Sequence, residues 1–186
     1  MGADIANLKA SLATLDDASF EKAVDTICNA KNIYILGKRS SNMLADFINH
    51  YFRYIFDNVH LVSTNTTIDM FEEVFRIDSN DVLIAISYPR YSKRTKIVAE
   101  FAKRRGATVI ALTDSDIAPI TTFADIKLFA RSDMASFVDS LVAPLSIINA
   151  LIVAIGRKKR LTLEKTFNEL EQIWDEYDVY EVPVRK

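Results

Sequence analysis

The sequence predicts an α/β domain, a three-layer sandwich in which helices cover both faces of a five-stranded parallel sheet. Short apolar runs alternate along the chain with segments of helical periodicity, which is the pattern of a parallel sheet built from strand–helix units. Each run is continuously apolar, as expected of strands that are buried on both faces. The 186 residues, 49% of them hydrophobic and 26% charged, suit one domain with a full core.

The first half of the chain contains three of the expected strands. The run "NIYILG" is the first strand, 32–37, and it ends in a glycine. The helix 40–56 follows, because apolar residues recur there at helical spacing, namely Leu44, Phe47, Ile48, Tyr51, Phe52 and Ile55. The run "VHLVS" is the second strand, 59–63, and "TIDMFEEVFRI" is the helix 67–77. The third strand, 81–87, is "DVLIAIS".

The second half begins with the helix 92–105, which ends at a glycine and has one apolar face, formed by Ile97, Val98, Phe101 and Ala102. The run "TVIALTD" is the fourth strand, 108–114, and "IKLFAR" is the fifth, 126–131. Two further helices, 135–158 and 162–175, complete the domain.

Two amphipathic helices, 4–13 and 17–30, precede the first strand. We therefore expect N-terminal helices in 1–30 that pack on the domain or on a dimer partner, and the domain itself, with its C-terminal helices, in 31–186. The most hydrophobic stretch, 137–155, has apolar runs far shorter than the ~20 residues that span a bilayer. We expect this stretch to be a helix that either threads the core or meets a copy of itself in a dimer.

Right-handed crossovers and short loops favour a flavodoxin-like strand order. In such sheets, ligands bind at the carboxyl ends of the strands near the point where the strand order reverses. This rule predicts a site in the loops that follow four of the strands, at 37–41, 87–92, 113–115 and 131–136.

These loops carry hydroxyl groups, two carboxylates and three guanidinium groups. Neutral donors at helix N-termini are typical of phosphate binding, so we expect a phosphorylated ligand to contact Gly37, Ser40, Ser41, Ser87, Tyr88, Arg90, Ser92, Asp114, Ser132 and Asp133. Helix capping alone explains any single one of these serines. The occurrence of hydroxyl groups in several loops at the same end of the sheet favours a ligand. Neither a P-loop nor a complete G-x-G-x-x-G motif occurs, which disfavours a nucleotide.

Charge and cysteine content exclude several classes of function. The net charge of −2 and the pI of 5.7 disfavour direct binding to a nucleic-acid backbone. Cys28 is the one cysteine, so an intrachain disulfide and a cysteine metal site are both excluded. We expect no cofactor, no metal and no membrane span, and a reducing cytoplasm as the natural compartment.

Three segments together resemble a known family. The runs "IYILGKRSS", "IAISYPRYSKRT" and "IALTDS" are similar to the sugar isomerase (SIS) domain, and in particular to the effector domain of RpiR-type transcription regulators. The resemblance extends over about 17–175. It implies the SIS fold and a phosphorylated sugar or amino sugar as the ligand.

The family pattern has Gly-x-Gly-x-Ser after the first strand and Ser-x-Ser-Gly-x-Thr-x-Glu after the third. Gly37 and Ser41 match the first pattern, and Ser87 and Ser92 match hydroxyl positions of the second. The chain departs from both patterns where Arg39 replaces a glycine, and where Pro89, Arg90 and Arg94 replace serine, glycine and glutamate.

Three functions remain open at this stage. The resemblance implies the effector-sensing part of a regulator, active as a homodimer or tetramer and reaching DNA only through a missing N-terminal helix-turn-helix module, since about 30 residues are too few for one. A sugar-phosphate isomerase needs a positioned base, yet His50 and His60 are badly placed, and Asp114 and Asp133 are weak bases. A degenerate scaffold that serves only dimerisation is the third. We favour a sensor that is not an enzyme.

Overall fold

A five-stranded, all-parallel sheet forms the centre of the computed structural model, which describes residues 1–64, 66–134 and 137–180. The strand order β2-β1-β3-β4-β5 is the predicted flavodoxin-like order. Each strand lies within one of the predicted runs; the strands are β1 (Ile33–Gly37), β2 (Val59–Leu61), β3 (Val82–Ile86), β4 (Thr108–Thr113) and β5 (Ile126–Phe129).

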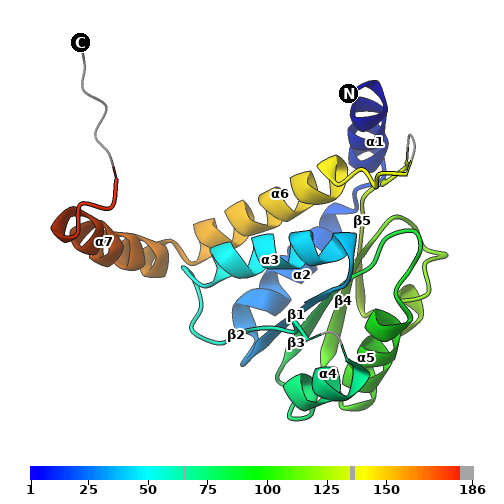
Figure 1. The fold of residues 1–186 in the computed structure, drawn as a ribbon, viewed down its shortest axis with the longest axis horizontal. Helices are drawn as coiled ribbons and strands as arrows, with labels where there is room; N and C mark the ends of the chain where they lie inside the picture. The colour runs from blue at the N-terminus through cyan, green and yellow to red at the C-terminus, as the bar shows by residue number, and fades with distance from the viewer. Residues whose placement is uncertain (65, 135–136, 181–186) are drawn as a thin grey trace.

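Helices cover both faces of this sheet, so the predicted three layers are confirmed (Figure 1). Side chains of a strand point alternately to the two faces. Ile33 and Ile35 therefore pack with α2 (Asp17–Asn29), α3 (Ser40–Phe52) and α6 (Val142–Lys158). Their neighbours on β1 point to the other layer, which consists of α4 (Thr67–Val74) and α5 (Lys93–Arg104).

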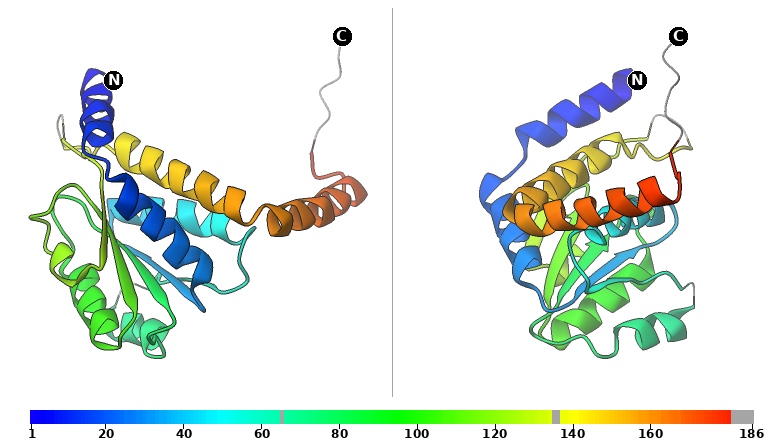
Figure 2. Two further views of the ribbon diagram at one scale, coloured as in Figure 1. Left: turned by 180° about the vertical axis from the view of Figure 1, so that it is seen from behind. Right: turned by 90° about the vertical axis from the view of Figure 1, so that its left-hand side faces the viewer.

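The remaining helices, α1 (Gly2–Ala13) and α7 (Arg160–Glu176), lie outside these layers. Helix α1 contacts α6, and the hydroxyl oxygen of Ser11 accepts a hydrogen bond of 2.8 Å from the backbone N–H of Arg131. Helix α7 extends away from the sheet beyond the end of α6, and no residue of it is buried (Figure 2). Whether 1–30 contacts a second copy of the chain stays a prediction.

The prediction for the last core helix was wrong at its start. Residues 135–136 lie outside the described residues, 137–141 are not helical, and α6 begins at Val142. Pro144 gives the reason, because proline is tolerated in the first turn of a helix but disrupts its interior.

Helix α6 also does not thread the core. One side of it packs on the sheet, while Val142 and Val153, on the opposite side, are 42% and 54% exposed. In the described part of the chain, no helix has both the length and the apolar content that a membrane crossing requires.

Candidate functional site

The candidate site lies at the carboxyl ends of β1 and β3, which are neighbours in the sheet. Strand β1 leads into α3 on one face, and β3 leads into α5 on the other. The two loops therefore diverge, and a crevice at such a point is the usual ligand site of an open parallel sheet. A small hollow is present there, and it is lined by Lys38, Arg39, Ser40, Ser41, Ser87, Tyr88, Pro89, Arg90, Ser92 and Asp139.

The loop after β1 brings the chain very close to the first turn of α3. A Cβ atom on Gly37 would lie 2.2 Å from the carbonyl oxygen of Ser41, so only glycine fits there. Arg39, which replaces the second glycine of the family pattern, has a φ of 59°, a conformation that is unusual for a residue with a side chain. No side chain among the described residues caps the first N–H groups of α3, and such groups favour an anion.

The loop after β3 is held by a chain of hydrogen bonds. The hydroxyl oxygen of Ser87 accepts from the backbone N–H of Ser92, and that of Ser92 accepts from the N–H of Thr95, both at 3.3 Å. Ser92 is thus the N-cap of α5, as capping alone predicts. A hydroxyl that accepts a hydrogen bond still has its own proton to donate, so capping and ligand binding are compatible at both serines.

Three cationic residues, Lys38, Arg39 and Arg90, line this hollow. Lys38 is buried, and its ammonium group donates hydrogen bonds to the carbonyl oxygens of Val62 and Thr64. Burial lowers the pKa of Lys38, an effect that the nearby charge of Glu73 opposes. Arg90 is half exposed and has a φ of 69°.

A carboxylate, Asp139, completes the lining. Its side chain is 9% exposed. One oxygen accepts a hydrogen bond of 2.9 Å from Arg90 Nη2, and the other accepts one of 2.6 Å from Ser40 Oγ. We call these three residues the Asp139 clasp.

Sequence reasoning missed Lys38, Arg39 and Asp139. The first two lie within the loop already considered, between Gly37 and Ser40, and a basic pair beside a phosphate-type loop was the available signal. Asp139 gave no such signal, because it falls inside the segment predicted as helical.

Tyr88 is almost fully buried beside the hollow, and its hydroxyl has no hydrogen-bond partner among the described residues. Such orphaned hydroxyl groups are uncommon in protein interiors. Burial, with a smaller effect of the charge of Asp114, raises the pKa of Tyr88, so this side chain is neutral and able to donate.

The structure does not bring Asp114, Ser132 or Asp133 to the lining of the hollow. Asp114 accepts a hydrogen bond of 2.8 Å from the hydroxyl of Tyr91. The hydroxyl of Ser132 donates to the carbonyl oxygen of residue 140 at 2.8 Å, and Asp133 is paired with its neighbour at 131 at 2.9 Å. Ligand contact by these three residues stays a prediction.

The two histidines also lie elsewhere. His60 stacks on Tyr34 with ring centroids 4.9 Å apart, and the exposed His50 lies between the rings of Tyr51 and Tyr54. Among the described residues that line the hollow, Asp139 is the one carboxylate.

Comparisons with known proteins agree with this fold. An uncharacterized HTH-type transcriptional regulator of Caldanaerobacter subterraneus is 28% identical over 156 residues, which are 82% of this chain and 55% of that protein. The chain spans about half the length of the curated relatives it matches.

Among solved structures, the sugar isomerase domain of an RpiR transcription factor from Sphaerobacter thermophilus matches with a TM-score of 0.85 and 24% identity, over 92% of this chain and 95% of that one. The NanR protein of Vibrio vulnificus, complexed with ManNAc-6P, matches with a TM-score of 0.81 and 16% identity, over 95% of this chain and 67% of that one. The predicted resemblance to regulators of this type is thereby confirmed. A family model described as the SIS domain matches residues 26–154, and the chain belongs to the SIS domain family.

Proposed function

We propose that this SIS domain binds a phosphorylated sugar or amino sugar and is the effector-sensing part of an RpiR-type transcription regulator. One observation carries the proposal: serines from two neighbouring strand ends line a single hollow together with Arg90 and the start of α3. The ligand named for NanR, ManNAc-6P, belongs to the same chemical class.

The chemistry of the hollow suits a phosphate group. The hydroxyl groups of Ser41, Ser87 and Ser92 are neutral donors, and the N–H groups at the start of α3 add the positive end of the helix dipole. The guanidinium group of Arg90 supplies a full charge in the form that best matches a phosphate.

Recognition without turnover fits the lining better than isomerisation does. Moving a proton between neighbouring carbons needs a base within hydrogen-bond reach. No histidine or glutamate is among the described residues that line the hollow, and its one carboxylate, Asp139, contacts Arg90 and Ser40, the groups that suit the phosphate rather than the sugar carbons. We therefore favour a sensor, whose working form is a homodimer or a larger oligomer that includes the exposed apolar side of α6.

The test is a thermal-shift screen against sugar phosphates and amino-sugar phosphates, each paired with its unphosphorylated parent. A ligand at 100 times its dissociation constant adds about 2.7 kcal/mol to the free energy of unfolding. We expect a shift with phosphorylated compounds alone, and its loss in the double variant Ser87→Ala, Ser92→Ala.

The matched control is Ser79→Ala, an exposed serine at the opposite edge of the sheet, which should keep the shift. Because Ser92 is an N-cap, the double variant loses about 1 kcal/mol of stability by itself, so each variant is compared with its own ligand-free melting curve. No shift with any compound would contradict the proposal and favour a dimerisation scaffold. Conversion of the bound compound to its isomer would show an enzyme.

A further inference from the structure

Asp139 is a carboxylate in a hollow whose other groups suit an anion. It lies on the segment 137–141, between β5 and α6, far in sequence from the two loops that it joins. Its side chain is nine-tenths buried. A buried carboxylate is stable only with charged or hydrogen-bonding partners, so the partners of Asp139 show what this position recognises.

Those partners are the groups that a phosphate would use. Arg90 Nη2 donates to one oxygen at 2.9 Å, and Ser40 Oγ, at the start of α3, donates to the other at 2.6 Å. Both distances are typical of strong, charge-assisted hydrogen bonds. The carboxylate therefore accepts from one donor on each side of the crevice, as two oxygens of a bound phosphate group would.

A phosphate and this carboxylate cannot share the same donors, because two negative groups at hydrogen-bond distance repel strongly where burial limits screening. We infer that Asp139 is a built-in anion that occupies the phosphate subsite, and that the phosphate group of the ligand displaces it from Arg90 and Ser40. This inference rests on the proposed function, and it adds how binding at the site is regulated.

Displacement of Asp139 would move a segment that is bonded to the helical layer. Its neighbour Ser140 donates a hydrogen bond of 2.7 Å to Asp4 on α1, and the carbonyl oxygen of Ser140 accepts from Ser132 at 2.8 Å. Two residues further on, α6 begins, and it contacts α1, α2 and α3. The Asp139 clasp thus couples occupancy of the phosphate subsite to the position of α1 and α6. It is a two-state element, closed without ligand and open with it, of the kind that ligands bias.

The first experiment measures binding of inorganic phosphate by calorimetry to the intact chain and to Asp139→Asn. Asparagine keeps the shape and an oxygen acceptor but removes the negative charge. We expect phosphate to bind Asp139→Asn about tenfold more tightly or better, since a charge at such a distance is worth at least that factor.

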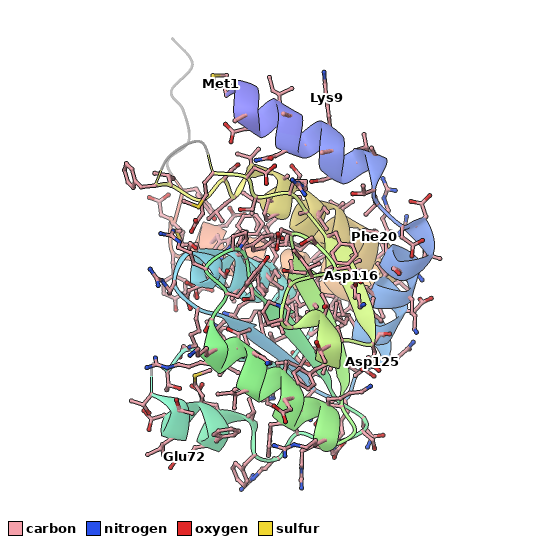
Figure 3. The ribbon with its side chains drawn as sticks, turned by 90° about the vertical axis from the view of Figure 1, so that its right-hand side faces the viewer. Met1, Lys9, Phe20, Glu72, Asp116 and Asp125 are labelled. Atoms are coloured by element: carbon pink, nitrogen blue, oxygen red, sulfur yellow. The ribbon has the colours of Figure 1, made fainter. Side chains whose placement is uncertain are left out.

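Asp116→Asn is the matched control, because it removes the same charge from an exposed ion pair. Asp116, which Figure 3 labels, follows β4 and pairs with Lys127 on β5. This substitution should leave phosphate affinity unchanged. Weaker or unchanged affinity in Asp139→Asn would overturn the inference while leaving the proposed function intact, and weaker affinity would instead mark Asp139 as a ligand contact. If neither protein binds phosphate, the inference fails, and the sugar-phosphate screen decides the proposed function separately.

A second measurement needs no substitution. Hydrogen exchange of the unaltered chain, with and without phosphate, should become slower at 87–92 and faster at 137–141, because the first loop gains a ligand while the second loses its anchor. Slower exchange in both segments would overturn the inference.

Discussion

The ends of β1 and β3 differ from the ends of β4 and β5 in what their polar side chains contact. After β1 and β3, serine hydroxyl groups line a hollow together with Arg90. After β4 and β5, the polar groups are bonded to neighbouring parts of the chain: Thr113 Oγ1 donates to the carbonyl oxygen of Ser87 at 2.6 Å, Asp114 accepts from Tyr91, and Ser132 donates to residue 140. In the sequence, nevertheless, both groups look alike, because each consists of polar residues at the carboxyl end of a strand.

Topology explains the difference. The connections from β1 and β3 turn to opposite faces of the sheet, towards α3 and α5, and so leave space between them. Strand β4 passes instead into a loop with one short turn of 3-10 helix, Thr121–Phe123, before β5. A polar strand end becomes a binding position only where its neighbouring loops diverge; elsewhere the same residue type stabilises the loop.

The largest expected effect is at the close approach that shapes the binding end. In Gly37→Ala the new Cβ would meet backbone atoms of Ser41 at 2.2 and 2.7 Å, and backbone yields far less easily than a side chain. We expect a loss of about 3 kcal/mol in the free energy of unfolding, measured by denaturant titration, because overpacking has costs of this size.

Gly156→Ala is the control for that substitution. Its Cβ would make an ordinary contact of 3.4 Å with Leu163, and alanine is the better helix former, so stability should stay equal or rise by about 0.5–1 kcal/mol. If Gly37→Ala is as stable as the unaltered chain, the close approach of β1 and α3 is not required.

The next effect tests whether the end of β4 is structural. Thr113 is fully buried, and Thr113→Val removes the hydroxyl that donates to Ser87 while keeping the shape. A buried carbonyl oxygen without its donor costs about 1–3 kcal/mol, so stability should fall by that amount. Phosphate affinity should not change, because Thr113 does not line the hollow.

Thr166→Val is the matched control, since that hydroxyl also donates to a backbone carbonyl oxygen but is exposed to water. It should alter stability by less than about 0.5 kcal/mol. Loss of phosphate binding in Thr113→Val at unchanged stability would break the comparison, because it would place the end of β4 in the binding site.

The sequence predicts the sheet better than it predicts the site. Continuous apolar runs such as 82–86, every residue of which is fully buried, carry their own signal of a two-sided sheet. The divergence of the loops has no such signal in the sequence, because it depends on which face of the sheet each helix covers. Asp139 was not predicted as a site residue for a related reason. The apolar stretch around it resembles a helix, whereas Pro144 places the start of the helix after Asp139.

The smallest expected effect separates the two roles that remain possible for Asp114. Burial, together with the hydrogen bond to Asp114 and its charge, raises the pKa of Tyr91 to about 12. A raised pKa means that the folded chain holds the phenolic proton more tightly than the unfolded chain does. Tyr91 therefore contributes stability that is fully present below pH ~10 and is lost as pH rises towards ~12.

In Asp114→Asn we expect the pKa of Tyr91 to fall towards its ordinary value while remaining above it, because burial persists after the carboxylate is gone. Ultraviolet titration, with Tyr91→Phe subtracted to isolate this one phenol among seven tyrosines, measures the change. If the role of Asp114 is structural, phosphate affinity near neutral pH stays constant in the same variant. An unchanged Tyr91 titration together with weakened binding of a sugar phosphate would contradict the structural role and restore Asp114 as a ligand contact, and the end of β4 would then belong to the site.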